Sequence, residues 1–241
     1  YSGAEKQLLA FAEKYNIPIA ETQAGKGIIP WQNPLNLGGI GVTGGKAANV
    51  IGRDADLVIG VGTRFSDFTT SSKWLFNENR KVLAINICPF DAYKMDAEAV
   101  VADAREALNA LVDALDGYKT KYTDEISKAK AEWDAIVDDY YTKELDGGLN
   151  QTLALGIINE FMGDEDIALG SAGSLPGDMQ RLFRPKGRGT YHMEYGFSNM
   201  GYEVNGALGA KLAKPEAEVY TFCGDGSFLM GHSELYTAVQ E

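Results

Sequence analysis

Residues 224–228 (Gly-Asp-Gly-Ser-Phe) are the strongest local sign of chemistry, because they join an apolar strand to the start of a helix. The carboxyl ends of parallel strands are where open α/β sheets bind ligands. Gly226 leaves room for a phosphate, and Ser227 with the free N–H groups of the helix can bind it. Asp225 is a hard oxygen ligand, suited to a Mg²⁺ ion that bridges a diphosphate. Asp-Gly pairs are also common in plain turns, so the local sequence leaves both interpretations open.

The preceding segment, residues 191–213, narrows the choice. It reads YHMEYGFSNMGYEVNGALGAKLA, and Asp225 follows Met200 by 25 residues. A Met-Gly-aromatic stretch, a helix of small residues, a strand and Gly-Asp-Gly-Ser in this order resemble the cofactor domain of thiamine-diphosphate enzymes of the acetolactate synthase type. Residues 60–70 (GVGTRFSDFTT) resemble part of the middle domain of the same family.

A narrower resemblance rests on further segments. They are ETQAGKG, NLGGIGVTG, GSLPGDMQRLFR and CGDGSFLMGHSELYT. Together they look like the trihydroxycyclohexane-1,2-dione hydrolases of bacterial inositol catabolism. That resemblance implies a thiamine-diphosphate enzyme that hydrolyses the carbon–carbon bond between the carbonyls of a cyclic polyol diketone. The alternatives are a 2-oxoacid decarboxylase or carboligase of the same superfamily, or a non-catalytic nucleotide-binding or assembly module.

The resemblance also implies a set of site residues. Asp225 would be a Mg²⁺ ligand, Met200 the apolar residue under the bent cofactor, and Ser198 the carbonyl that accepts from the cofactor's amino group. Ordinary core packing is the alternative for the methionines. The implied cofactor-binding residues are Gly173, Ser174, Leu175, Ser198, Met200, Asp225, Gly226, Ser227 and Met230.

The same resemblance implies parts that this sequence lacks. The second metal ligand, an Asn, would fall beyond Glu241, and a glutamate that protonates the cofactor would come from an amino-terminal domain. The family builds its site between subunits, so a homodimer or homotetramer is implied. We therefore expect the sequence to be a fragment that is inactive alone and binds thiamine diphosphate weakly.

Three other features carry weaker signals. Residues 39–44 fit the pattern GxGxxG, but a poor strand precedes them, so a dinucleotide site is disfavoured. Residues 60–64 follow a true strand, where relatives hold FAD, and a structural turn is the favoured interpretation. His192 is a candidate substrate contact or proton-transfer group, with a structural hydrogen bond as the alternative.

Composition limits the class of protein. The chain has 241 residues and a formal net charge of −12, which disfavours nucleic acid as a partner. Its apolar runs are too short to span a membrane. Two cysteines, Cys88 and Cys223, are too few for a disulfide framework, so we expect a cytoplasmic protein.

The elements that must position these residues alternate between helix and strand. This pattern predicts an α/β fold with two open parallel-sheet domains joined by a helical connector. We expect a middle domain over residues 1–117, a connector over 118–148 that Gly147 and Gly148 terminate, and a truncated cofactor domain over 149–241. Near-continuous apolar runs at 56–62 and 81–87 predict strands covered on both faces. Glycine-rich loops are expected at 25–45 and 184–201, and one helix is expected from residue 228 to the end.

Overall fold

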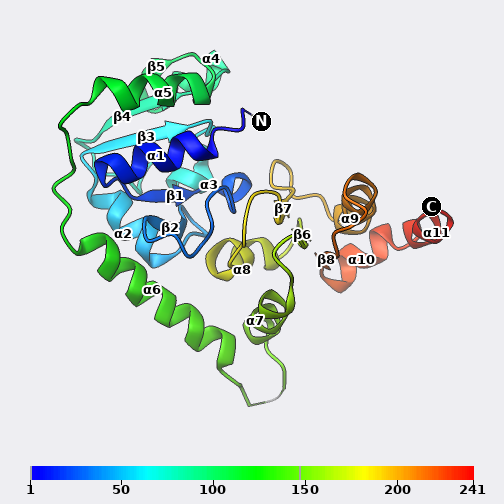
Figure 1. Cartoon of the computed structure of the whole chain (residues 1–241). Helices are drawn as coiled ribbons and strands as arrows, with labels where there is room; N and C mark the ends of the chain where they lie inside the picture. Colours follow the sequence, from blue (N-terminus) through cyan, green and yellow to red (C-terminus); the bar gives the residue numbers. More distant parts are fainter. Residues whose placement is uncertain (1, 147) are drawn as a thin grey trace. The chain divides into compact units, whose positions relative to one another are not determined.

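The computed structural model describes residues 2–146 and 148–241, which form two compact units (Figure 1). Unit 1 comprises Tyr1–Gly25 and Gln32–Ala135, and unit 2 comprises Lys26–Trp31 and Ile136–Glu241. Every pair of neighbouring strands named below is parallel. The predicted α/β class with parallel sheets is confirmed.

Unit 1 packs helices on two small sheets. Its helices are α1 (Glu5–Tyr15), α2 (Lys46–Asp54), α3 (Asp67–Thr70), α4 (Pro89–Ala92) and α5 (Ala104–Ala114), with short 3₁₀ turns at Gln23–Gly25 and Lys94–Asp96. Its strands are β1 (Ile19–Glu21), β2 (Asn36–Gly39), β3 (Leu57–Val61), β4 (Lys81–Ile85) and β5 (Glu98–Val100). Helices α1 and α5 meet through buried Phe11, Tyr15 and Leu108, and Ile59 of β3 packs against this cluster.

Two expectations for unit 1 were wrong. The segment 25–45 is not all loop, because β2 lies inside it and pairs with β1 through Ile19 and Asn36. Strand β3 is not covered on both faces, since Leu57 is 47% exposed. The strand order β3-β4-β5 explains this, because β3 is an edge strand and only β4 is flanked on both sides.

Unit 2 is built around a three-stranded sheet of order β7-β6-β8. Its strands are β6 (Ile167–Gly170), β7 (Tyr191–Met193) and β8 (Val219–Phe222), and its helices are α7 (Gln151–Phe161), α8 (Leu175–Leu182), α9 (Tyr202–Ala213), α10 (Asp225–Gly231) and α11 (Glu234–Gln240). Leu155, Ala168, Met179 and Phe222 belong to one buried cluster that joins helices α7 and α8 to the sheet.

Unit 2 also departs from expectation at two places. The segment 184–201 contains β7, whose Tyr191 and Met193 are buried against the core while His192 is exposed. The last helix begins at Asp225 and divides into α10 and α11 around His232, whose Nδ1 lies 2.7 Å from the Leu229 carbonyl oxygen. Glycine-rich composition concealed a strand because only three residues pair, too few for a clear alternation.

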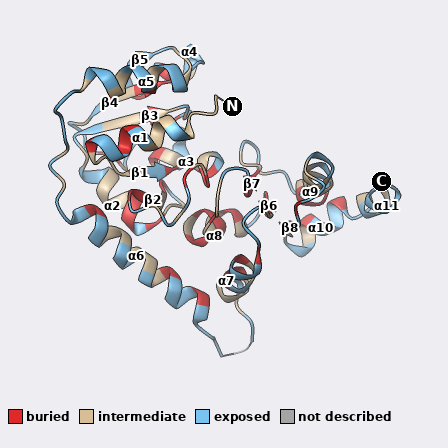
Figure 2. Cartoon of the chain, in the orientation of Figure 1, coloured by how far each residue is buried: buried red, intermediate tan, exposed pale blue. Residues whose placement is uncertain are grey.

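The connector contains helix α6 (Glu125–Thr142), and the boundary between the units falls within it. Figure 2 shows α6 mostly exposed. Its buried residues are Ile126, Val137 and Tyr141. The helix ends before the predicted glycines. Gly148 instead forms an isolated bridge with Leu145, and Gly147 lies outside the described residues.

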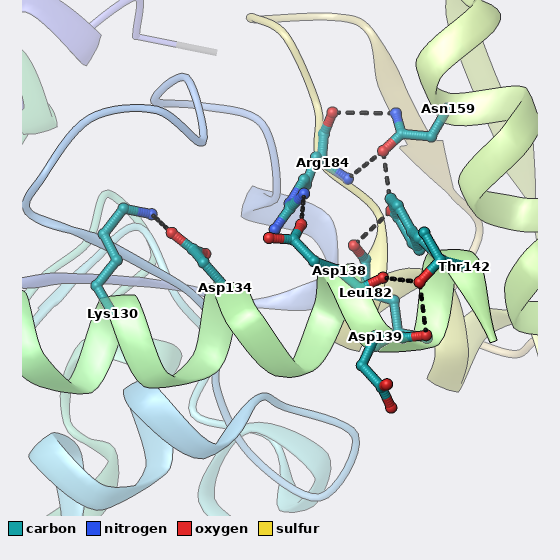
Figure 3. Close-up of polar contacts among 9 residues, drawn as sticks. Lys130, Asp134, Asp138, Asp139, Thr142, Asn159, Leu182 and Arg184 are labelled. Carbon is teal, nitrogen blue, oxygen red and sulfur yellow. Dashed lines mark hydrogen bonds and ion pairs between the residues drawn. The ribbon is translucent and has the colours of Figure 1, made fainter.

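A polar network attaches the end of α6 to unit 2 (Figure 3). The Tyr141 hydroxyl shares its proton between Asn159 Oδ1 at 2.9 Å and the Leu182 carbonyl at 2.7 Å. The Asn159 amide bonds both the N–H and the carbonyl of Arg184, whose guanidinium lies 2.6 Å from Asp138. Burial raises the pKa of Tyr141 well above its usual range, so the phenol stays a donor.

Among the described residues, no helix combines the length and the apolar character needed to cross a membrane.

Candidate functional site

The candidate site lies where the strands of unit 2 end. Because β7, β6 and β8 are parallel neighbours, the loops that follow them leave the same edge of the sheet. These loops comprise residues 171–174 after β6, 194–201 after β7 and 223–224 after β8, the last leading into α10. Sequence analysis assigned the cofactor to residues in and just beyond these three loops.

Several of the predicted residues are brought together here. A Cβ atom on Gly226 would lie 3.2 Å from Met200 Cε, and one on Gly201 would lie 3.2 Å from Met230 Cβ. Gly201 has φ of +89°, a conformation that glycine adopts without strain. Met200 is 49% exposed and Met230 66% exposed. Neither methionine is therefore ordinary core filling within unit 2.

Other predicted residues have different surroundings. The Ser174 hydroxyl lies 3.3 Å from Gln151 Oε1 on α7, and Leu175 packs against the core of unit 2. Ser198 has φ of +52°, in the left-handed region that glycine favours.

Glu203 is a buried carboxylate that sequence analysis missed. It is fully buried at the second position of α9, and it accepts hydrogen bonds from Ala172 N–H and Gly201 N–H, each at 3.1 Å. The Ser227 hydroxyl donates to it at 2.5 Å. A single side chain thereby bonds all three segments of the site.

Glu194 is a second missed carboxylate, and it shapes the loop after β7. It accepts from the N–H groups of Gly196, Phe197 and Asn199 at 3.0–3.1 Å and from the Ser171 hydroxyl at 3.3 Å. Burial alone would raise the pKa of Glu194, but these four donors together hold it below the ordinary value. The loop that presents Ser198 and Met200 is therefore folded around an ionised carboxylate.

His192 lies beside this loop. Its ring stacks on Tyr202 with centroids 5.8 Å apart, and Nε2 lies 2.7 Å from the Tyr202 hydroxyl. Burial lowers the pKa of His192, and the Glu194 charge offsets part of that effect. Burial and the same charge raise the pKa of Tyr202. A neutral imidazole and a protonated phenol suit a proton-transfer pair as well as a structural contact.

The site has room for an anionic group along its backbone. A Cβ added to Gly173 or Gly224 would meet no atom within 4 Å, so the peptide groups there are open. Asp225 is exposed, and its Oδ1 accepts from Gly226 N–H at 2.8 Å, which leaves its second oxygen for a cation. Within the described residues, no group of three or more His, Cys, Asp or Glu side chains gathers around a metal position. These residues fit a diphosphate with one protein carboxylate for its metal.

Each glycine motif of unit 1 contains a glycine that is closed by packing. The Gly41 N–H and carbonyl both bond to the Asn49 side chain at 2.9 Å, and a Cβ on Gly41 would lie 2.1 Å from the Phe68 carbonyl oxygen. At Gly60 a Cβ would lie 2.3 Å from the Phe65 ring. At Gly62, by contrast, a Cβ would meet no atom within 4 Å. The structural interpretation of these two segments stays a prediction.

Comparison with known families agrees with this geometry. Residues 1–111 match the family described as "Thiamine pyrophosphate enzyme, central domain", and residues 171–241 match "Thiamine pyrophosphate enzyme, C-terminal TPP binding domain". The chain belongs to the thiamine pyrophosphate enzymes. Thiamine pyrophosphate is the thiamine diphosphate of the sequence analysis, and the second match contains all three segments of the site.

Individual relatives are similar along the whole chain. It is 50% identical to 3D-(3,5/4)-trihydroxycyclohexane-1,2-dione hydrolase of Clostridium tetani and 51% identical to that of Geobacillus thermodenitrificans. Both comparisons include 100% of this chain but only 42% and 41% of the relative. The Bacillus cereus protein of the same name is 50% identical with similar coverage. The chain thus spans about two fifths of the length of these relatives.

Proposed function

We propose that the whole protein containing this chain hydrolyses a carbon–carbon bond of a cyclic 1,2-diketone, trihydroxycyclohexane-1,2-dione, in inositol breakdown. The observation that carries the proposal is the identity of about half of all positions, along the entire chain, with relatives that bear this name. Water completes the cleavage, which opens the ring to a deoxyuronic acid. This chain supplies the middle domain (1–117), the connector (118–148) and residues 149–241 of the cofactor domain.

Different residues of unit 2 bind different parts of the cofactor. The open backbone around Gly173 and Gly224 binds the diphosphate together with the Gly226 turn, and Asp225 binds its Mg²⁺. Met200 lies against Gly226, where an apolar side chain supports a bent cofactor. Bound thiamine diphosphate supplies a thiazolium that accepts the electron pair released from the broken bond. His192 with Tyr202 contacts the polyol ring or moves a proton beside it.

Further parts of the proposal concern the setting of the enzyme. We infer a homodimer or homotetramer in the cytoplasm, with no nucleic acid or membrane as partner. The free thiols of Cys88 and Cys223 and the net charge of −12 support this setting.

Turnover by the full-length protein tests the reaction. With thiamine diphosphate and Mg²⁺, we expect the cyclic dione to be consumed with release of one acid group, and pyruvate and glyoxylate to be left unchanged. Turnover of 2-oxoacids alone would assign the protein to the decarboxylases or carboligases. Binding of cofactor without any turnover would favour a non-catalytic module.

Asp225→Asn tests the metal ligand. Asparagine keeps the Oδ1 that accepts from Gly226 N–H, so the turn is preserved while the charge is lost. Calorimetry on the full-length protein should show Mg²⁺-dependent affinity for thiamine diphosphate weakened roughly tenfold to a hundredfold. The matched control is Asp164→Asn, an exposed carboxylate of the same unit (89% side-chain exposure), which should bind as the wild type does. Equal affinity of both variants would remove Asp225 from the metal site.

A further inference from the structure

The buried carboxylate of Glu203 requires an explanation, because a charge removed from water is costly unless hydrogen bonds replace its hydration. Its three donors are all neutral groups, two backbone N–H groups and one hydroxyl. They come from three segments that are distant in sequence, at Ala172, Gly201 and Ser227. Filling space in the core would need none of these bonds.

The Ser227 hydroxyl is fully engaged in this arrangement. Ser227 is 3% exposed, its hydroxyl donates to Glu203 Oε2 at 2.5 Å, and it accepts from Gly201 N–H at 2.8 Å. A serine hydroxyl has one proton to donate. Since Glu203 takes that proton, the Ser227 side chain has none for a phosphate oxygen. A bound diphosphate would therefore meet the backbone of this turn.

We propose that Glu203 is a positioning residue that fixes the loop after β6, the start of α9 and the first turn of α10 as one preformed cradle. That the cradle serves the cofactor rests on the proposed function. That the three segments are joined rests on the three hydrogen bonds to Glu203. In this arrangement the Ser227 hydroxyl belongs to the Glu203 cluster and is not a ligand of the diphosphate.

Amide hydrogen exchange in the full-length protein, prepared without cofactor, tests the arrangement. Glu203→Gln keeps the shape but turns one acceptor oxygen into an NH₂ group, so a donor loses its partner. We expect exchange at Ala172 and Gly201 to accelerate at least about tenfold. Ser227→Ala should accelerate exchange at Gly201 and leave Ala172 unchanged, because only Gly201 donates to that hydroxyl.

Two controls separate local loosening from general loss of stability. Glu144→Gln makes the same chemical change at an exposed position and should leave both amides unchanged. Asn159→Ala removes a buried amide whose partners are Tyr141 and Arg184, so it should lower unit 2 stability without a selective effect at Gly201. Unchanged exchange at Ala172 and Gly201 in a folded Glu203→Gln variant would overturn the proposal.

Cofactor affinity of the full-length protein tests whether the cradle serves to bind thiamine diphosphate. Glu203→Gln should weaken binding of thiamine diphosphate, measured by calorimetry with Mg²⁺, by about tenfold or more. The double variant Glu203→Gln/Ser227→Ala should bind thiamine diphosphate only slightly more weakly than Glu203→Gln, since both changes act through one cluster. Additive losses would make Ser227 a direct ligand and contradict the proposal. If the wild type fails to bind the cofactor, the proposed function fails, while the exchange experiment still decides the role of Glu203.

Discussion

Two glutamates hold the backbone of the candidate site in place through hydrogen bonds. Glu203 joins three segments, whereas Glu194 folds the single loop that presents Ser198 and Met200. They lie nine positions apart, and both accept backbone N–H groups beside glycines. Loops rich in glycine gain little rigidity from their own residues, so buried acceptors can fix their shape.

Glu194 makes the stability of unit 2 depend on pH. Because its folded pKa is lowered, its contribution is complete above the ordinary carboxyl pKa of about 4.3 and is lost as pH falls through the lowered value. Thermal unfolding should therefore show wild type more stable than Glu194→Gln near neutral pH, by a margin that shrinks as the pH falls below the ordinary carboxyl pKa. Glu144→Gln should show no such shrinking margin, and a margin independent of pH for Glu194→Gln would contradict the assignment.

His192 should titrate below the ordinary histidine pKa of about 6.5, because burial disfavours its charged form. Its contribution to stability is present above that pH and declines as pH falls below it. NMR titration of the ring protons measures the midpoint directly. Glu194→Gln should lower the midpoint further, because the Glu194 charge that stabilises the imidazolium is then absent. A midpoint at or above the ordinary value would argue against the stacked position of the ring on Tyr202.

The residues that sequence could identify were those in short motifs. Asp225, Gly226, Met200 and Met230 meet at one edge because each occupies a fixed place relative to a strand end. The two glutamates have no such signature, since their role comes from donors on other segments. The available signal was weak: an acidic residue inside an otherwise apolar or glycine-rich stretch.

Among the elements, α6 shows how a charged helix acquires a fixed end. Its carboxyl-terminal turn contains Tyr141, which is 5% exposed, beside Tyr140, which is 42% exposed. The buried Tyr141 hydroxyl donates to Asn159 Oδ1 and to the Leu182 carbonyl. The Arg184 guanidinium lies 5.5 Å from the centre of the Tyr141 ring. Hydrogen bonds to α7 and to the last residue of α8 thereby hold the helix where its apolar stripe is thin.

Tyr141→Phe should destabilise unit 2 by about 1–3 kcal/mol, because two buried acceptors lose their shared donor. Denaturant unfolding followed by circular dichroism gives the free energy. Tyr140→Phe changes the same group at the neighbouring exposed position and should remain within about 0.5 kcal/mol of wild type. Equal changes in the free energy of unfolding for the two variants would show that the hydrogen bonds of the Tyr141 hydroxyl do not stabilise unit 2.

Element prediction succeeded for the apolar runs at 56–62 and 81–87, which contain β3 and β4. It failed for two short strands inside the expected loops 25–45 and 184–201. Strands β2 and β7 have four and three residues, and each depends on a partner strand, β1 or β6, for its hydrogen bonds. Pairing of that kind is a tertiary property, which local composition does not encode.

At the scale of the molecule, each unit has its own core. Leu108 is fully buried with Phe11 and Tyr15 in unit 1, and Leu155 is 1% exposed in the cluster of unit 2. The division at residue 135 falls inside α6, where the charged pattern gave no sign of it. The proposed boundaries at 117 and 148 remain predictions about family domains.

Leu108→Ala and Leu155→Ala test the separation of the cores, and each serves as the control for the other. Each truncation should destabilise by about 2–5 kcal/mol, since a cavity replaces buried contacts. Exchange mass spectrometry should show accelerated exchange in residues 32–135 for Leu108→Ala and in residues 136–241 for Leu155→Ala. Acceleration spread evenly over the chain would indicate a single cooperative core.

The short segment Lys26–Trp31 belongs to unit 2 although unit 1 flanks it on both sides. Trp31 N–H donates to the Pro185 carbonyl at 3.4 Å, and the Arg184 guanidinium lies 4.4 Å from the centre of the Trp31 ring. During synthesis, Trp31 is added to the chain 154 residues (185 − 31) before Pro185. At about 5–20 residues per second, the interval is roughly 10–30 s. A nascent chain can therefore contain all residues of unit 1 before the partner of Trp31 has been made.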